Sequence, residues 1–241
     1  MIVEAYIIAW NEAETIHLTI KHYQKFCTSI KIFDNYSDDG TPDICRSMGC
    51  NVQSFGIPGV LDDREYTKLK NNCWKKSEAD FVFVVDADEI FYFYGENNRL
   101  RLSLLKIYGY SIIKPQGWQV IDHFVPRETW VEATRGYRDD NYSKLCCFDP
   151  KAIKEINYVH GCHVAKPVGK IQLAEVGMLF HYRNIGGPQR LIERHKLYRS
   201  RMSDWNKRWN AGIHYTYEDE RRLKEWNEQY EKSVEYSPLG G

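Results

Sequence analysis

The stretch FVFVVDADEI, residues 81–90, places three acids, Asp86, Asp88 and Glu89, directly after five apolar residues. Such a run predicts a short strand buried on both faces. Carboxylates crowded at the end of that strand repel each other and lose hydration, so a positive partner must compensate them. Carboxylate oxygens are the ligands that Mg2+ and Mn2+ prefer. The spacing therefore favours a divalent cation, although a purely structural role for the tripeptide DAD stays open.

Two further polar clusters follow predicted strands. IVEAYIIA is followed by Trp10, Asn11 and Glu12, and SIKIFDN ends in Asp34 and Asn35. In an open parallel sheet, ligands bind beyond the carboxyl ends of the strands. Acidic clusters at one such edge suit a phosphorylated ligand when a cation bridges carboxylates to phosphate. The alternatives are local: Asn11 as a helix N-cap, and the segment 38–41 as a turn.

The elements that must position these residues alternate in the first ninety positions. Strands are predicted at IVEAYIIA, SIKIFDN, CNVQSF and FVFVVDAD, and helices over about 12–27, after Thr41 and Pro42, and over about 62–79. Asn11 and Glu14 have the spacing of a capping box for the first helix. Strand–helix alternation with short loops predicts an α/β fold with a mostly parallel central sheet covered by helices on both faces.

The second half has a different pattern. SIIKP, WQVIDHF, YSKLCCF and KIQLAEVGMLFHY are typical of strands, so we expect the sheet to become mixed. From Gly187 onward the pattern is helical. We expect one domain over 1–215, made of a nucleotide-binding half (1–95) and an acceptor and metal half (96–185), with a helical C-terminal extension over 186–241.

Composition limits the classes of function. The number of Lys plus Arg residues equals that of Asp plus Glu, at 33 each, so the chain lacks the net positive charge that would attract nucleic acid. The seven cysteines include no CxxC pair, and we expect reduced, mostly buried thiols in a cytoplasmic protein. No apolar run approaches the roughly 20 residues of a membrane-spanning helix.

The order and spacing of the motifs are recognisable. AYIIAWNEAETI, IKIFDNYSDDGT and DFVFVVDADEIFYF together resemble the nucleotide-sugar-binding half of a GT-A glycosyltransferase, of the family-2-like group with the pattern KNE…DNxSxDgT…DxDEF. INYVHGCHVAKPVG and MLFHYRNIGGPQRLIERHKLYRSRMS are similar to the later motifs of that group. The resemblance extends to about residue 215 and implies the GT-A fold.

The resemblance implies a donor site for a nucleotide-diphosphate sugar, most often a UDP-sugar. Asp88 would coordinate Mn2+ or Mg2+, and Asp86 would reach the ribose or a metal-bound water. Arg64 or Lys68 would offset phosphate charge. The residues implied to surround the nucleotide are Ala9, Trp10, Asn11, Glu12, Asp34, Asn35, Asp86 and Ala87.

A third metal ligand late in the domain is often His. His163 fits that position best and His160 is second. His181 would contact the metal ligands and orient them without binding the metal itself. His214 lies in a motif, GIHY, that the group shares.

An inverting enzyme also needs a general base for the acceptor hydroxyl. The candidates are Asp122, Asp139 or Asp140, and Glu89. A structural role is the alternative for each, and the stereochemical outcome stays open.

The acceptor would be a glycan or a lipid-linked or protein-linked hydroxyl. Trp118 and Trp130 could stack on sugar rings or belong to the core. The basic segment 183–208 could contact an anionic membrane or the diphosphate, but we favour a solvated helix face.

Other classes must be weighed. Phosphatases of the haloacid dehalogenase type also end a strand in DxD, but on their first strand, whereas here about eighty residues precede it. A nucleotidyltransferase with paired acids and two metals would share the nucleotide site. A binding protein that keeps the fold would have no physical reason to retain the crowded charges. Because these acids repel one another, we expect Asp88→Asn to relieve that repulsion in the metal-free protein.

Overall fold

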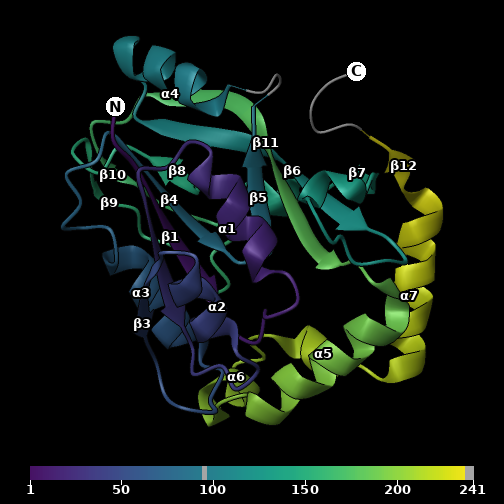
Figure 1. Cartoon of the computed structure of the whole chain (residues 1–241). Coiled ribbons are helices and arrows are strands. Elements are labelled where there is room, and N and C mark those ends of the chain that lie inside the picture. The colour runs from purple at the N-terminus through teal and green to yellow at the C-terminus, as the bar shows by residue number, and fades with distance from the viewer. Residues whose placement is uncertain (94–96, 237–241) are drawn as a thin grey trace.

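The computed structural model describes residues 1–93 and 97–236, and Figure 1 shows a central sheet with helices around it. The strands of the first half are β1 (Val3–Ala9), β2 (Ser29–Asp34), β3 (Asn51–Ser54), β4 (Phe81–Asp86) and β5 (Glu89–Tyr92). Those of the second half are β6 (Ile112–Ile121), β7 (Arg135–Arg138), β8 (Cys147–Phe148), β9 (Ile153–Glu155), β10 (Val168–Gly169), β11 (Leu173–Asn184) and β12 (Val234–Glu235).

The helices lie between and after these strands. They are α1 (Ile16–Gln24), α2 (Thr41–Ser47), α3 (Asp63–Asn72), α4 (Asn98–Ile107), α5 (Gly187–Arg201), α6 (Asp204–Arg208) and α7 (Asp219–Lys232). Three short 3-10 turns are η1 (Trp130–Glu132), η2 (Asp140–Tyr142) and η3 (Ile213–Thr216). None of the helices in the described ranges has both the length and the apolar character needed to cross a membrane.

The first half forms a parallel sheet in the order β3-β2-β1-β4. Its register brings the predicted polar clusters to one edge, because Ala9 pairs with Asp34 and Ile8 with Asp86. The run Phe81–Val85 is buried throughout, as its apolar composition predicts. Burial on both faces explains the absence of alternation in that run.

Alternate residues of β1 face opposite sides of the sheet. Val3, Ala5 and Ile7 pack in one core cluster that includes residues of α1, α2 and α4. Tyr6 and Ile8 pack in a second cluster, to which α3 contributes. The predicted α/β class, with a parallel sheet covered by helices on both faces, is confirmed for this half.

The second half makes the sheet mixed, as expected. β11 pairs parallel with β6 and antiparallel with β5, while β7 and β8 pair antiparallel with β6. SIIKP and WQVIDHF are one continuous strand, β6, rather than two. Gly117 permits this, since a Cβ there would lie 2.4 Å from the backbone of Tyr142. YSKLCCF is a strand only at Cys147–Phe148, because η2 precedes it.

The first helix begins later than its capping pattern predicts. Asn11 adopts a left-handed conformation with φ of 50° and donates from its side chain to Asp38, so it is not the N-cap. α1 begins at Ile16, after Thr15. The polar loop between β1 and α1 is therefore longer than the pattern predicts.

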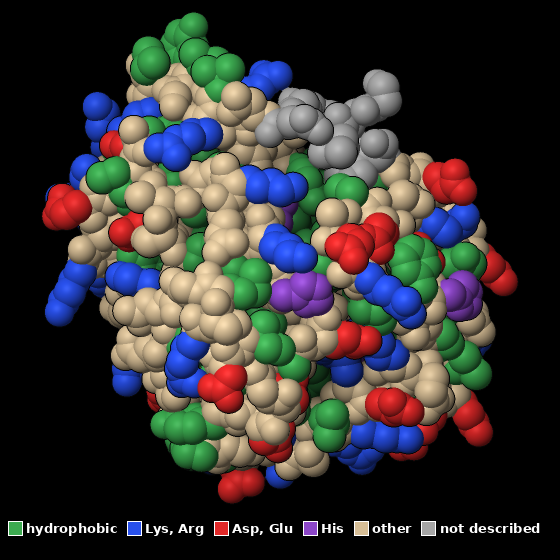
Figure 2. Space-filling model, in the orientation of Figure 1, with side chains coloured by type: hydrophobic (Ala, Val, Ile, Leu, Met, Phe, Trp, Pro, Cys, Tyr) green, Lys and Arg blue, Asp and Glu red, His purple; other side chains and the backbone are tan. Residues whose placement is uncertain are grey.

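The chain beyond Gly187 is helical, as predicted, and returns to the carboxyl edge of the parallel sheet. In Figure 1, α5 and α6 lie below the sheet and α7 stands along one side of it. β12 then adds to the sheet beside β7. Figure 2 shows basic and acidic side chains interspersed over one face of the molecule, in keeping with the zero net charge.

Candidate active site

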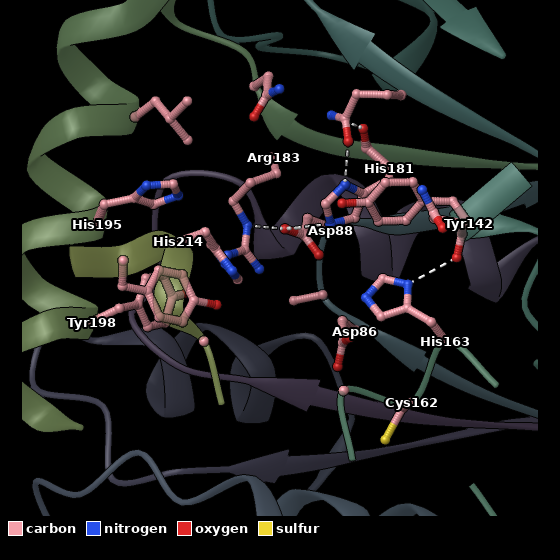
Figure 3. Close-up of a pocket in the computed structure, with 18 of the residues that line it drawn as sticks. Asp86, Asp88, Tyr142, Cys162, His163, His181, Arg183, His195, Tyr198 and His214 are labelled. Carbon is pink, nitrogen blue, oxygen red and sulfur yellow. Dashed lines mark hydrogen bonds and ion pairs between the residues drawn. The ribbon is translucent and has the colours of Figure 1, made fainter. Parts of the chain in front are cut away.

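A cavity of about 670 Å3 lies beyond the carboxyl ends of β1 and β4. Asp86 and Asp88 line it, and residues of α5, η3 and α7 form its opposite wall. Figure 3 shows these two acids with His163 and His181 on one side, and His195 and His214 on the other. The cavity lies where ligands bind in open α/β sheets.

The chain itself supplies a cation for each acid at the end of β4. Lys70 lies 2.7 Å from Asp86, and Arg183 donates to Asp88 at 2.7 Å. Lys144 forms an ion pair with the buried Glu89. The compensation that the sequence requires is thus supplied by side chains of the chain itself. Three acids and three cations leave this cluster without net charge.

The ionisation of these acids follows from their pairing. Burial raises the pKa of Asp88, but the guanidinium of Arg183 outweighs that effect and holds the pKa well below its usual range. Burial likewise opposes Lys144 and Lys70 at Glu89, and the net pKa of Glu89 is lowered. Both groups are therefore carboxylates at neutral pH.

The proton of His181 is placed by its neighbour Gln119. The Nε2 atom of Gln119 donates to the carbonyl oxygens of Val120 and His181, at 3.0 Å each, so its Oε1 is an acceptor. That Oε1 lies 2.8 Å from Nδ1 of His181, which must carry the proton. Burial lowers the pKa of His181 to about 3, so the ring is neutral and its Nε2 presents a lone pair.

That lone pair faces a carboxylate. Nε2 of His181 lies 3.6 Å from Oδ2 of Asp88, the oxygen that also accepts from Arg183. Oδ1 of Asp88 is buried and has no hydrogen-bond partner among the described residues. Two acceptors that face each other are repulsive until a cation lies between them. Metal-binding histidines usually donate their other ring N–H to an acceptor, as Nδ1 does here to Gln119. The donor set of Asp88 and His181 therefore fits a divalent cation.

The other predicted metal ligands are placed differently. His163 lines the cavity, but its Nδ1 lies 2.8 Å from the carbonyl of Asn141 and its ring packs edge-on against Tyr142. His160 contacts Thr67 and Trp205. The imidazole beside Asp88 is His181, to which the sequence pattern gave only a supporting role. Within residues 1–93 and 97–236, no three His, Cys, Asp or Glu side chains gather closely enough to form a metal site by themselves.

The neutral histidines predict how stability depends on pH. Burial, more than any other cause, lowers the pKa of His22 and His181 to about 3, of His195 to about 2 and of His214 to about 4. These groups have ordinary pKa values in the unfolded chain, so their contribution is present above pH 6.5 and is lost as the pH falls. We expect the free energy of unfolding in urea to drop by several kcal/mol between about pH 7.5 and 5.5. An equal free energy at both pH values, at constant ionic strength, would contradict their neutral burial.

The predicted nucleotide residues divide into two groups. Those that line the cavity are Ala9, Trp10, Glu12, Asp86 and Ala87. Those outside its lining are Asn11, Asp34 and Asn35.

The residues outside the lining join the loops that follow β1 and β2. Asp34 accepts hydrogen bonds from the backbone and hydroxyl of Ser37, and Asn11 bonds with Asp38. The side chain of Asn35 donates to the carbonyl of Phe55. These residues hold the edge of the site rather than face its interior.

The predicted phosphate-binding cations on α3 face away from the cavity. Arg64 pairs with Asp62 and Lys68 is exposed. The helical period instead turns Asp63, Thr67 and Lys70 inward, since they are spaced by four and three residues. Lys70 was missed because a lysine in a polar helix gives no sign of burial. The i, i+4, i+7 spacing from Asp63 is the signal that could have found it.

Of the four candidate bases, three lie outside the cavity lining. Glu89 is buried against Lys144, and Asp140 faces solvent beside Arg138. Asp122 is buried and accepts a hydrogen bond from the backbone of His123. Asp139, the neighbour of Asp140, does line the cavity. Asp139 is the N-cap of η2 and accepts a hydrogen bond from the backbone of Asn141, whereas Asp140 is its first residue.

The two candidate sugar-stacking tryptophans do not line the cavity either. Trp130 is a core residue that packs on Tyr182 and donates to Thr19. Trp118 packs against Tyr236 and Phe180.

The basic segment turns several arginines inward rather than toward a membrane. Arg194 bonds with Glu12 at 3.1 Å, and Arg190 with Glu14 at 3.0 Å. Arg201 stacks over Trp10, with its guanidinium carbon 3.5 Å from the ring centre. The favoured reading of a solvated face holds for residues such as Lys196, which pairs with Asp219 at the surface. One face of α5 thus contacts the loops that follow β1 and β2, through Arg194 and Arg201.

No protein-family model and no curated protein matches the chain. Among solved structures, the chain is similar to S. aureus TarS, with 12% identity, over 82% of this chain and 39% of that one, at a TM-score of 0.48. For TarS 1-349 the identity is 13%, over 95% and 71%, at 0.47. Glucosyl-3-phosphoglycerate synthase from Mycobacterium tuberculosis, in complex with Mn2+, UDP-glucose and phosphoglyceric acid, matches 48% of this chain and 44% of its own, with 18% identity and a TM-score of 0.35. All three TM-scores lie below 0.5.

Proposed function

We propose that this chain is a GT-A glycosyltransferase that transfers a sugar from a nucleotide-diphosphate sugar, in the first instance a UDP-sugar, to an acceptor hydroxyl with the help of Mn2+ or Mg2+. The observation that carries the proposal is the donor pair of Asp88 and His181, beside Asp86, in a cavity at the carboxyl ends of the strands. The motif resemblance supports the same activity independently.

The roles follow from the contacts. Asp88 and His181 would hold the cation, which would supply charge to a leaving diphosphate. Asp86, neutralised by Lys70, would lie beside it to bind a water or the ribose. Arg183 and Lys70 carry donors that can turn from carboxylates to phosphates once a metal occupies the acids. If a carboxylate removes the acceptor proton, Asp139 is the candidate that lines the cavity.

The direct test is product analysis. The protein, incubated with UDP-, GDP- and dTDP-sugars, should slowly release nucleoside diphosphate and free sugar only when Mn2+ or Mg2+ is present. A thermal-shift screen with the same donors should identify the best one, since a ligand of the folded state raises the melting temperature. Release of inorganic phosphate would indicate a phosphatase instead, and no donor turnover at all would contradict the proposal.

A measurement of Mn2+ affinity should distinguish the role of His181 from that of His163. We expect His181→Phe to weaken Mn2+ binding at least about 10-fold, because the ring that stacks on Tyr142 at 4.1 Å is kept while the lone pair is lost. The matched variant His163→Phe should bind Mn2+ as the unaltered protein does. Binding is measured by calorimetry in the absence of donor, with thermal unfolding as the check on folding. The reverse pattern would restore the sequence-based assignment to His163.

A further inference from the structure

One part of the cavity is formed by the C-terminal helices. We call it the C-terminal lobe, and its lining residues are Leu191, His195, His214, Arg222, Glu225 and Trp226. They come from α5, η3 and α7. In Figure 3, Arg183 lies between His195 and His214 on one side and Asp88 and His181 on the other. The lobe is therefore a separate wall of the same cavity.

Arg222 is the cation of this lobe, and its charge is incompletely matched. Its side chain is 10% exposed and donates through Nη1 to Glu225 at 3.1 Å. Its Nε and Nη2 atoms are buried and have no hydrogen-bond partner in the described part of the chain. The other oxygen of Glu225 accepts from Arg221 at 2.8 Å. Two guanidinium groups thus share one carboxylate, which leaves one positive charge.

His195 carries a second unsatisfied group in the lobe. It is buried, and its Nδ1 atom has no partner within the described ranges. Burial and the charge of Arg222 keep its pKa low, at about 2, so the ring is neutral. His214 lies beside it, with ring centres 5.7 Å apart. Buried polar atoms without partners are rare in native proteins, so a ligand that supplies acceptors is a natural explanation.

The other arginine that lines the cavity is matched, since Arg183 bonds with Asp88. Arg194 bonds with Glu12 through its terminal nitrogens. Its Nε, and two nitrogens of Arg201, have no hydrogen-bond partner among the described residues, but neither arginine lines the cavity. Among the arginines that line the cavity, Arg222 therefore has both an unbalanced positive charge and N–H donors without a partner in the described ranges.

We propose that the C-terminal lobe binds the acceptor through an anionic group, a phosphate or a carboxylate, held by Arg222 with His195 beside it. The inference rests on the proposed function, since it names the class of acceptor for that site. A planar guanidinium with two free N–H groups matches the paired oxygens of either anion. Trp226 and Leu191 lie in the lining beside it as buried core residues.

The test uses inorganic phosphate as the probe, with acetate as the carboxylate arm and a chelator to exclude metals. Binding is followed through the imidazole C–H resonances of His195 and His214. Arg222→Gln should weaken the binding of the better anion at least about 10-fold, because it removes the charge and the paired N–H donors that would hold the anion. Arg222→Lys, which keeps the charge, should lose less, and thermal unfolding checks that both variants fold.

Arg221→Gln is the matched control. Arg221 immediately precedes Arg222 and shares the carboxylate of Glu225. Its side chain is 57% exposed and does not line the cavity. The Arg221→Gln variant should therefore bind the anion as the unaltered protein does. Equal losses in the two glutamine variants, the absence of any response to phosphate or acetate, or displacement of the anion by UDP would each overturn the inference. Donor hydrolysis by the unaltered protein is measured separately, so a failure of the proposed function is distinguished from a failure of this lobe assignment.

Discussion

Asp88→Asn should lower kcat/KM for sugar transfer by at least about 100-fold, with donor-dependent Mn2+ binding lost in parallel. The amide keeps the shape of the side chain but removes the charge that, with His181, would hold the cation. A metal contributes several kcal/mol to the stabilisation of a leaving diphosphate, and about 1.4 kcal/mol corresponds to tenfold in rate. Transfer and Mn2+ affinity are measured on the same preparation.

The matched control for this variant is Asp43→Asn. Asp43 forms an exposed ion pair with Arg46 on α2 and does not line the cavity, so the Asp43→Asn variant should transfer sugar as the unaltered protein does. Wild-type transfer by Asp88→Asn would remove the basis of the proposed function.

We expect Asp88→Asn to lower the free energy of unfolding, whereas the sequence alone suggests that it would raise it. Three crowded acids imply that removing one charge relieves repulsion. In the folded chain, however, Asp88 accepts from Arg183, whose side chain is only 19% exposed. The amide leaves that guanidinium without a counter-charge, and we expect a loss of about 1–3 kcal/mol in the free energy of unfolding.

Lys144→Met should destabilise the fold by about 3–5 kcal/mol at neutral pH. Lys144 and Glu89 are both almost fully buried and form an ion pair. The variant leaves the carboxylate of Glu89 in the core without its nearest counter-charge, although Lys70 still contributes. The free energy of unfolding is measured in urea.

Acidification distinguishes this mechanism from a packing defect. In the variant, burial without the ammonium group raises the pKa of Glu89, and protonation then removes the uncompensated charge. The difference from the unaltered protein should therefore shrink as the pH falls through that raised pKa. A difference independent of pH would assign the loss to packing.

Lys75→Met serves as the control for this second variant. Lys75 and Glu155 form a pair with 35% and 44% of their side chains exposed. Exposed pairs contribute at most about 1 kcal/mol. A comparable loss in both lysine variants would show that burial of the Lys144 pair is not the cause.

Periodicity was enough to predict the parallel half of the sheet. The run Phe81–Val85 and the alternating faces of β1 are set by side-chain hydrophobicity along a short segment, and strand position follows from it. That same logic places Asp86 and Asp88 at the carboxyl edge. Capping was less informative, because Asn11 bonds with Asp38 in the next loop, a contact between residues 27 positions apart.

The sequence by itself determined the α/β class, the edge at which the site lies and the acids that line it, since these depend on local pattern and on the direction of parallel strands. Only the tertiary structure decided which cations meet those acids and which histidine faces Asp88. Lys70, Lys144 and Arg183 come from three distant segments, and Gln119, on a neighbouring strand, fixes the proton of His181. Contacts of that kind depend on how separate elements pack: helical spacing can show that Lys70 faces inward, but it does not name the acid that Lys70 meets.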